Sequence, residues 1–467
     1  MRFKNIFATR NMIKESFITG NIPSSREAYG ISLRIALPSV IEMTSLAFIG
    51  MISTAMVGRW LGPEAVAAVG LVGQPRMIFM ALFFALNVGV TAVISRRKGQ
   101  ENHREARLCV RQAMLLAIVI SIVMSALAVS LARPMMQLAG AQPDTIDLAT
   151  SYFRITSMAL PLNALTMTIS AAQRGIGNTR VTMVVNIAAN IVNVIFHFLL
   201  IEGRYGFPQL GVEGAAIAVA ISGGVSLTLA VGSLLKRNAY LKVSRRDSWR
   251  LDLPMIKSIA KIGGNSIFEQ MCMRIGFFVY VIIVASLGTA AFASHQIAMQ
   301  LMHLSFNFAD GIAVATTALV GQQLGAKRPD LSIMYGKIGQ RMALVVSMFL
   351  CVFTVFGRFW FPSMFTDDQS IIAMTAGVML ILVVVQPIQT SQLVMAGCLR
   401  GAGDTRFVAF TMLISVALAR PLVSLLFVYG FNMGLQGAWY AIIVDQGLRL
   451  IMLYGRFAKG KWTEIKI

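Results

Sequence analysis

The chain has 467 residues, of which 56% are hydrophobic and only 13% are charged, and its mean hydropathy is +0.70. Soluble globular domains carry about 25% charged residues. Apolar runs of about 20 residues recur along the chain, and each is long enough to cross a hydrocarbon core of about 30 Å. Only helices satisfy their backbone polar groups within one lipid-exposed segment, so the sequence predicts an all-α polytopic membrane protein.

The net charge of +21 does not indicate a nucleic-acid-binding protein. Such proteins gather basic residues on a soluble module, and the sequence contains no such module. Lys and Arg in cytoplasmic loops explain the charge instead. The sequence contains no P-loop, and its four cysteines follow no metal-ligand or disulfide spacing. We therefore expect no enzyme, no ATP-driven mechanism, no cofactor and no metal site.

Hydropathy predicts twelve spans after a basic cytoplasmic arm at 1–30. Most of the 41 Lys and Arg residues fall on the side of the N-terminus, which places both termini in the cytoplasm. Because no apolar stretch precedes residue 31, we expect insertion into a plasma or bacterial inner membrane through the spans, without a cleaved signal peptide. The predicted spans are 33–57, 66–94, 112–133, 148–172, 179–202, 211–235, 258–286, 290–320, 337–360, 371–396, 405–430 and 436–457.

The stretch Arg174-Gly-Ile-Gly-Asn-Thr-Arg180 returns as Arg400-Gly-Ala-Gly-Asp-Thr-Arg406, at an offset of about 226 residues. Pro161 and Pro387 match at the same offset, so six spans repeat six spans. An even number of spans per repeat gives parallel repeats, an arrangement typical of transporters with a site between two lobes. The predicted parts are the arm (1–30), an N-lobe (31–235), a basic cytoplasmic linker (236–257), a C-lobe (258–458) and a cytoplasmic tail (459–467).

Charged groups inside spans are functional candidates, because a charge at mid-bilayer costs about 2.5–3.5 kcal/mol on insertion scales. The first span carries Glu42, with Ser53 farther along it, and the seventh carries Glu269 at a nearly equivalent position of the repeat. A buried carboxylate can exchange a proton near neutral pH. We predict cation-coupling roles for Glu42, Glu269, Ser53 and Asp310, with a salt bridge to Arg76 or Arg274 as the alternative for the glutamates.

Two spans carry polar side chains at helical spacing, which places each set on one helix face. Such faces line either a substrate cavity or a hydrogen-bonded helix interface. The fifth span contributes Asn186, Asn190, Asn193 and His197. The eighth contributes Gln296, Gln300, His303, Asn307 and Asp310.

Several other polar residues have simpler interpretations. Asp445 and Arg449 are spaced four apart in the last span and predict a neutralising ion pair. Arg420 could bind an anionic group or pair internally, and His295 is expected near a membrane interface. The 29 methionines are compatible with an adaptable drug-binding surface or with ordinary lipid-facing positions.

Over about residues 31–460 the chain resembles the multidrug and toxic compound extrusion (MATE) transporters. The resemblance rests on Leu37-Pro38, on the turn Met56–Ala65 and on the two Arg-Gly-x-Gly loops. Asn190-Ile-Val-Asn193 and Gly434-x-x-Gly437 add to it. The resemblance implies a V-shaped pair of six-helix lobes that exports organic cations or other amphipathic compounds in exchange for H⁺ or Na⁺.

The chain departs from this family at several acidic positions. Ser53 occurs where many members have an Asp, and His197 where some have an acid. The tenth span carries Gln386, Gln389 and Gln392 instead of an Asp. Fewer carboxylates disfavour Na⁺ and favour a proton bound by Glu42 and Glu269.

Two alternatives to an antiporter remain open. The first is a flippase or exporter of lipid-linked or anionic metabolites from a related two-lobed family, although the predicted cavity faces carry few cations. The second is the major-facilitator architecture, which does not account for the doubled loops. For the antiporter we expect a monomer whose partners are a small molecule, H⁺ or Na⁺, and membrane lipids.

Overall fold

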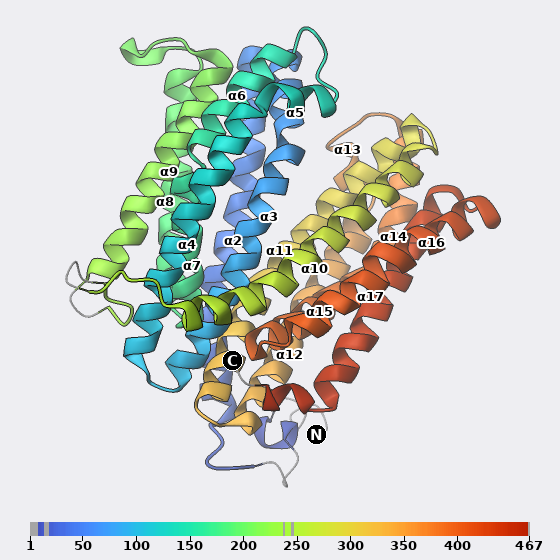
Figure 1. The fold of residues 1–467 in the computed structure, drawn as a ribbon. Helices are drawn as coiled ribbons and strands as arrows, with labels where there is room; N and C mark the ends of the chain where they lie inside the picture. Colours follow the sequence, from blue (N-terminus) through green and yellow to red (C-terminus); the bar gives the residue numbers. More distant parts are fainter. Residues whose placement is uncertain (1–7, 14–17, 237–238, 244–246, 466–467) are drawn as a thin grey trace. The chain divides into compact units, whose positions relative to one another are not determined.

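The computed structural model describes residues 8–13, 18–236, 239–243 and 247–465. These residues form helices and no β-strand, which confirms the predicted all-α class. Parts of the predicted arm, linker and tail lie outside the described residues. The first helices are η1 (Thr9–Met12), α2 (Ser25–Leu61), α3 (Pro63–Gly99), α4 (His103–Ser130), α5 (Ala132–Leu138), α6 (Ile146–Met158), α7 (Leu160–Gly175), α8 (Thr179–Leu200), η3 (Arg204–Gly206) and α9 (Gly211–Leu235) (Figure 1). The remainder are α10 (Leu253–Ala285), α11 (Thr289–Gly325), α12 (Pro329–Gly357), α13 (Trp360–Ser363), α14 (Gln369–Ala402), α15 (Thr405–Met412), η4 (Leu413–Ala419), α16 (Arg420–Leu425), η5 (Leu426–Gly430), α17 (Gly434–Ala458) and η6 (Lys461–Glu464).

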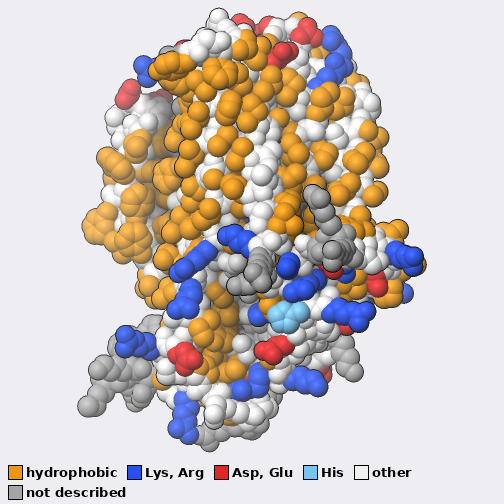
Figure 2. Space-filling model, turned by 90° about the vertical axis from the view of Figure 1, so that its left-hand side faces the viewer, with side chains coloured by type: hydrophobic (Ala, Val, Ile, Leu, Met, Phe, Trp, Pro, Cys, Tyr) orange, Lys and Arg blue, Asp and Glu red, His pale blue; other side chains and the backbone are white. Residues whose placement is uncertain are grey.

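Ten helices of the described chain are long and apolar enough to cross a membrane, and the count is eleven if α6 and α7, bent by 48° at the break between them, are taken as one span. The predicted count of twelve is not confirmed, because α17 is not among these helices. It has 25 residues and carries buried Asp445, Gln446 and Arg449. One face of the molecule is covered by hydrophobic side chains, and Lys and Arg gather toward one end of it (Figure 2). This distribution is typical of a multi-pass membrane protein.

The chain divides into two compact units, and the division falls inside two helices. The N-unit comprises Thr44–Gly263, and the C-unit comprises Met1–Met43 together with Gly264–Ile467. The first half of α2 therefore packs in the C-unit, where Val40 lies against Gly311 of α11. Within the C-unit, α11, α12, α14 and α17 pack side by side (Figure 1). Within the N-unit, α3 packs on α4 and α7, and α8 packs on α9.

The doubled Arg-Gly-x-Gly stretch allows two helices to approach closely and then ends one of them. A Cβ on Gly401 would collide with the backbone carbonyl of Thr317, so α14 meets α11 with no side chain between them. The Thr317 hydroxyl donates to the carbonyl of Gly397, 2.9 Å away. The second glycine, Gly403, has a φ of 86°, the left-handed conformation that ends α14.

The first copy of the stretch repeats this arrangement in the N-unit. A Cβ on Gly175 would lie 3.1 Å from the carbonyl oxygen of Thr91, and the Thr91 hydroxyl donates to Ala171 at 3.1 Å. Gly177 has a φ of 83°. The stretch is therefore a structural element of both repeats.

The segment before α2 is fastened to α12 of the C-unit. Asp330 is completely buried and accepts hydrogen bonds from the hydroxyl of Thr19, at 2.9 Å, and from Arg328. The Asp330 side chain raises the pKa of Arg328 above its usual value by hydrogen bonding. Lys337 donates to the carbonyl of Met12, whose side chain is buried in the core of the unit. The start of α2 is thus fixed to the C-unit.

The segment before α10 is fastened in the same way to α4 of the N-unit. The amide of Gln112 donates to the carbonyl of Arg250 at 2.8 Å and accepts from the backbone N–H of Asp252 at 3.2 Å. Arg107 donates to the carbonyl of Tyr240. The helices α4 and α12 occupy equivalent positions in the two repeats. The first helix of each repeat, α2 or α10, is therefore anchored at its beginning in the same manner.

The close approach at Gly401 can be tested by adding a single methyl group. Gly401→Ala should lower the free energy of unfolding by about 1–3 kcal/mol, because the methyl group would be forced against α11. Gly447→Ala is the matched control, since a Cβ on Gly447 meets nothing within 4 Å and should stabilise α17 by about 0.5–1 kcal/mol. Thermal unfolding in detergent measures both variants, and equal unfolding temperatures would contradict the contact.

Candidate functional site

The C-unit buries an ion pair between α10 and α14. Glu269, which is 1% exposed, accepts from the Nη2 of Arg400. The charge of Asp310 on α11, which is half-buried, also acts on Arg400. The sequence suggested Arg76 or Arg274 as the partner of a glutamate, and the structure pairs Glu269 with Arg400 instead. Arg400 belongs to the doubled stretch, so this copy of the stretch also has an electrostatic role.

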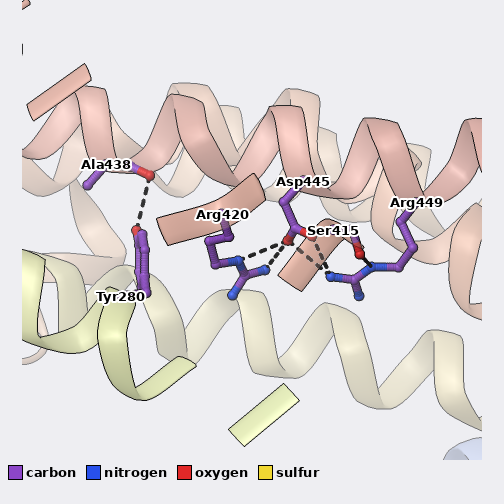
Figure 3. Close-up of polar contacts among 6 residues, drawn as sticks. All are labelled: Tyr280, Ser415, Arg420, Ala438, Asp445 and Arg449. Carbon is purple, nitrogen blue, oxygen red and sulfur yellow. Dashed lines mark hydrogen bonds and ion pairs between the residues drawn. The ribbon is translucent and has the colours of Figure 1, made fainter. Parts of the chain in front are cut away.

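A second group of charges lies where α16 and η4 meet α17 (Figure 3). Asp445 accepts from the Nε of Arg420 at 2.9 Å, and the Nη2 of Arg420 also donates to it. From the other side, Nη2 of Arg449 donates to the two oxygens of Asp445 at 2.8 and 3.0 Å. Nε of Arg449 donates to the hydroxyl of Ser415 at 3.4 Å. We call Arg420, Asp445 and Arg449 the triad, and none of the three is more than 5% exposed.

Local backbone structure explains how Arg420 reaches Asp445. Arg449 lies four residues after Asp445 and so shares its face of α17. Arg420 begins α16, a short helix between the two π-helical segments η4 and η5. The wider turn of a π-helix changes which residues face a neighbour, and π-helical segments often occur at functional sites. This departure from the α-helical period brings Arg420 and Ser415 to α17.

Two aromatic rings contact Arg420 of the triad. The Arg420 guanidinium lies 4.5 Å from the ring centroid of Phe277 and 5.5 Å from that of Tyr280, distances typical of cation–π contacts. The hydroxyl of Tyr280 donates to the carbonyl of Ala438 at 3.2 Å (Figure 3). These rings replace water around the guanidinium.

His295, which we predicted near a membrane interface, is buried in the C-unit, and its depth in the membrane stays a prediction. It is 2% exposed and packs against the rings of Tyr280 and Trp439, with ring centroids 5.6 Å away in each case. Nδ1 of His295 and Nε1 of Trp439 have no hydrogen-bond partner among the residues that the structure describes. Helical periodicity places His295 on the buried face of α11, together with Ala291 and Ala298.

The predicted polar face of α11 lies on the opposite side from His295. Gln296, Gln300 and His303 are exposed, and Asn307 is half-buried. This face contains no Lys or Arg. Apart from half-buried Asp310, it is therefore an uncharged polar surface of the C-unit, and its exposed residues are not covered by the helices of that unit.

The predicted polar residues of α8 are placed differently. Asn193 and His197 are buried in the N-unit, and Asn186 and Asn190 are half-buried. The hydroxyl of Ser53, on the second half of α2, donates to the amide oxygen of Asn193 at 3.3 Å. The Nδ2 atom of Asn190 has no hydrogen-bond partner within the described chain. The N-unit thus brings Ser53 together with part of the α8 set, without a carboxylate.

Glu42 and Glu269 belong to the same compact unit, although they come from different repeats. Glu42 is fully buried on the first half of α2, one residue before the boundary of the C-unit. Two residues earlier, Val40 lies against Gly311, which follows Asp310 on α11. The glutamines predicted in place of an acid, Gln389 and Gln392, are buried on α14. No group of three or more His, Cys, Asp or Glu able to hold a metal ion occurs in the described part of the chain.

Six charged residues on α10, α11, α14, α16 and α17 carry no net charge together, when Glu42 on α2 is left aside. Three carboxylates, on Glu269, Asp310 and Asp445, accompany three guanidinium groups. The guanidinium groups belong to Arg400, which pairs with Glu269, and to Arg420 and Arg449, which pair with Asp445; the charge of Asp310 acts on Arg400. The triad carries one excess positive charge, whereas Glu269, Asp310 and Arg400 together carry one excess negative charge. Protonation of one carboxylate would leave the set with a net positive charge.

Comparison with known proteins identifies the family to which the chain is similar. The sequence matches the family described as MatE over residues 38–199 and again over 266–426, one match in each repeat. It is 28% identical over 444 residues to "Probable multidrug resistance protein NorM" of Thermotoga maritima, which covers 92% of both chains. It is 26% identical over 434 residues to "Uncharacterized transporter YisQ" of Bacillus subtilis, covering 91% of this chain and 93% of that one.

Solved structures show the same fold. A multidrug resistance MATE family transporter in an outward-facing conformation matches with a TM-score of 0.85 at 20% identity. The match covers 93% of this chain and 97% of that one. A MATE transporter in a straight conformation matches with a TM-score of 0.85 at 21% identity, covering 93% and 95%.

The triad predicts a large effect on stability. Asp445→Asn should lower the free energy of unfolding by about 3–5 kcal/mol, because it leaves two buried guanidinium groups without a counter-charge. Asp147→Asn is the control, since the ion pair of Asp147 with Arg133 is exposed and contributes at most about 1 kcal/mol. Thermal unfolding of both purified variants decides the matter, and similar stability would show that the triad is not a paired buried cluster.

Proposed function

Because the chain belongs to the MatE family of multidrug and toxic compound extrusion transporters, we propose that it is a secondary antiporter that exports organic cations, drugs or amphipathic metabolites in exchange for protons. The observation that carries the exchange mechanism is the buried ion pair of Glu269 with Arg400 inside a predicted span. Ionisable side chains inside membrane spans mark ion pathways and proton relays in transporters. Relatives named as multidrug resistance proteins support the substrate class.

In this mechanism a proton neutralises Glu269 and weakens its pairing with Arg400. The freed guanidinium then repels a cationic substrate and pairs more strongly with Asp310, whose charge already acts on it. The exposed polar side chains of α11, among them Gln300 and His303, would hold the substrate in the unprotonated state. Glu42 would be a second proton-accepting carboxylate of the C-unit.

The polar residues of the N-unit also have a role in the proposed mechanism. Ser53, Asn193 and His197 would contribute neutral polar contacts to substrate or to the coupling cation. We further propose that the protein acts as a monomer in a bacterial inner membrane with both termini in the cytoplasm. The gathering of basic side chains at one end of the molecule supports this orientation (Figure 2).

A flippase or exporter of anionic or lipid-linked metabolites remains the second candidate. Such a protein needs cations that an anionic substrate can reach. The triad has an excess of arginine, but Arg420 and Arg449 are at most 5% exposed and are paired with Asp445. The accessible face of α11 carries no cation. These observations favour the antiporter.

Glu269→Gln should abolish gradient-driven efflux without preventing expression, because the amide cannot bind and release the coupling proton. Ethidium accumulation in cells that express the variant measures this, and Glu42→Gln is tested alongside. Glu105→Gln is the matched control, since that glutamate is partly exposed and pairs with Arg97 outside the site. Normal efflux in both site variants would contradict the proposed role of the carboxylates.

Inverted vesicles distinguish the coupling ion. An imposed proton gradient should drive ethidium uptake, and an imposed Na⁺ gradient at constant pH should not. Uptake driven by Na⁺ alone would overturn the proton assignment. Flipping of a fluorescent lipid-linked precursor, without ethidium transport, would support the second candidate.

A further inference from the structure

A small pocket lies inside the N-unit at the break between α6 and α7. The two helices bend by 48° at this break, and irregular backbone at membrane depth occurs where it is buried in protein or lines a cavity. The lining residues come from α3, α4, α6 and α7 and are Arg76, Phe79, Ala128, Phe153, Thr156, Ser157, Leu160 and Asn163. The cavity volume is about 10 Å³, which is room for one water-sized group. Sites for drug-sized ligands measure about 300–1,000 Å³, so this pocket suits a much smaller ligand.

Arg76 brings a positive charge to this pocket without a counter-charge. It is half-buried on α3 and makes no hydrogen bond or ion pair with any residue that the structure describes. The acidic residue of α3, Glu64, lies twelve residues earlier, about 18 Å along the helix at 1.5 Å per residue. Arg420 and Arg449 of the C-unit, by contrast, are both paired with Asp445. A guanidinium group inside a span is costly without a partner, so an anion from solution would stabilise Arg76.

A hydroxyl group and an amide group line the same pocket. Ser157 is 6% exposed, and its hydroxyl makes no hydrogen bond within the described part of the chain. Its carbonyl accepts from the hydroxyl of Ser125 at 2.8 Å, which holds this position of α6 against α4. Nδ2 of Asn163 carries two N–H groups, and one of them donates to the carbonyl of Ala159 at 3.4 Å. A buried hydroxyl without a partner is unfavourable, so Ser157 also favours a ligand in the pocket.

We propose that the pocket binds one chloride ion, which neutralises Arg76 and accepts hydrogen bonds from Ser157 and Asn163. The lining residues include one guanidinium group and no carboxylate, so the site favours an anion, whereas a water molecule would leave the charge of Arg76 uncompensated. The small volume favours a monatomic anion over a phosphate or a substrate carboxylate. Chloride is the monatomic anion that cells and their surroundings supply. The bound ion would connect α3 with both sides of the break between α6 and α7, apart from the carboxylates of the proposed exchange mechanism.

Chloride binding can be measured as stabilisation of the purified full-length protein in detergent. When chloride replaces gluconate at constant Na⁺ concentration and constant ionic strength, the unfolding temperature should rise and then saturate, because a ligand of the folded state stabilises it. Bromide should act like chloride, whereas sulfate should have no such effect. The absence of a rise with chloride would overturn the proposal. An equal rise with sulfate would also overturn it, since it would indicate a site open to phosphate groups of lipids.

Two arginine variants separate anion binding from a merely structural role. Arg76→Gln removes the charge and should abolish the dependence of the unfolding temperature on chloride. If Arg76 only packed against its neighbours, this variant would lose stability equally in chloride and in gluconate and would keep the chloride dependence. Arg154→Gln is the matched control, since Arg154 is an exposed arginine of α6, and it should respond to chloride like wild type. An unchanged response in Arg76→Gln, or an equal loss in both variants, would contradict the proposed site.

A serine variant tests the site even if Arg76→Gln does not fold. Ser157→Ala keeps the charge and removes one hydroxyl, so the chloride concentration for half-maximal stabilisation should rise about tenfold, as loss of a hydrogen bond to an ion predicts. Ser130→Ala is the control, because the hydroxyl of Ser130 is exposed at the end of α4. Anomalous diffraction from crystals soaked in bromide should place one ion beside Arg76. Water alone at that position, or an unchanged half-maximal concentration in Ser157→Ala, would overturn the proposal.

The transport assay keeps this inference separate from the proposed function. Glu269→Gln should lose efflux and yet keep the chloride response of wild type, because Glu269 belongs to the C-unit. A chloride response in a protein without proton-driven uptake would support the anion site and contradict the antiport. Proton-driven uptake in a protein without a chloride response would support the antiport and overturn the anion site.

Discussion

A charged side chain inside a membrane span is stable only when a counter-charge accompanies it, and this constraint governs the C-unit. The cost of removing an ion from water exceeds what one imperfect contact returns. Asp445 therefore accepts from two arginines at once, and Glu269 from one. These pairs connect α10, α14, α16 and α17, so the ionic contacts and the helix packing depend on each other. A change of protonation at one carboxylate alters the electrostatic balance of the whole set.

The two repeats share a backbone but not this chemistry. The glycines that bring α14 onto α11 have equivalents that bring α7 onto α3. The positions of α9 that correspond to Asp445 and Arg449, aligned on the glycines that begin α9 and α17, are Ser222 and Ser226. The Ser226 hydroxyl contacts that of Thr166 at 3.2 Å. Helix packing is thus common to both halves, whereas the buried ion pairs of Glu269 and Asp445 occur in the C-unit.

The sequence predicted the features that follow from helical periodicity and from the free-energy cost of placing polar groups in a membrane. Hydropathy indicated the spans, and the spacing of Asp445 and Arg449 indicated their pairing. The pairing of Glu269 with Arg400 could not be predicted, because 131 residues separate them and a loop position was expected for the arginine. The partner of Arg420 stayed open because a pattern based on 3.6 residues per turn does not describe the π-helical segments around it. Tertiary contacts and local helix type decided these cases.

The division of α2 between the units places Glu42 and Ser53 on one helix but in different units. Glu42 lies on the half that packs in the C-unit, whereas Ser53 lies on the half that packs in the N-unit and donates to Asn193. Pro38 lacks a backbone N–H and weakens the helix close to this boundary. The segment before α2 is fixed to α12 by Asp330. Glu42 and Ser53 therefore lie on a single helix whose beginning is held in the C-unit and whose second half contacts a polar residue of the N-unit.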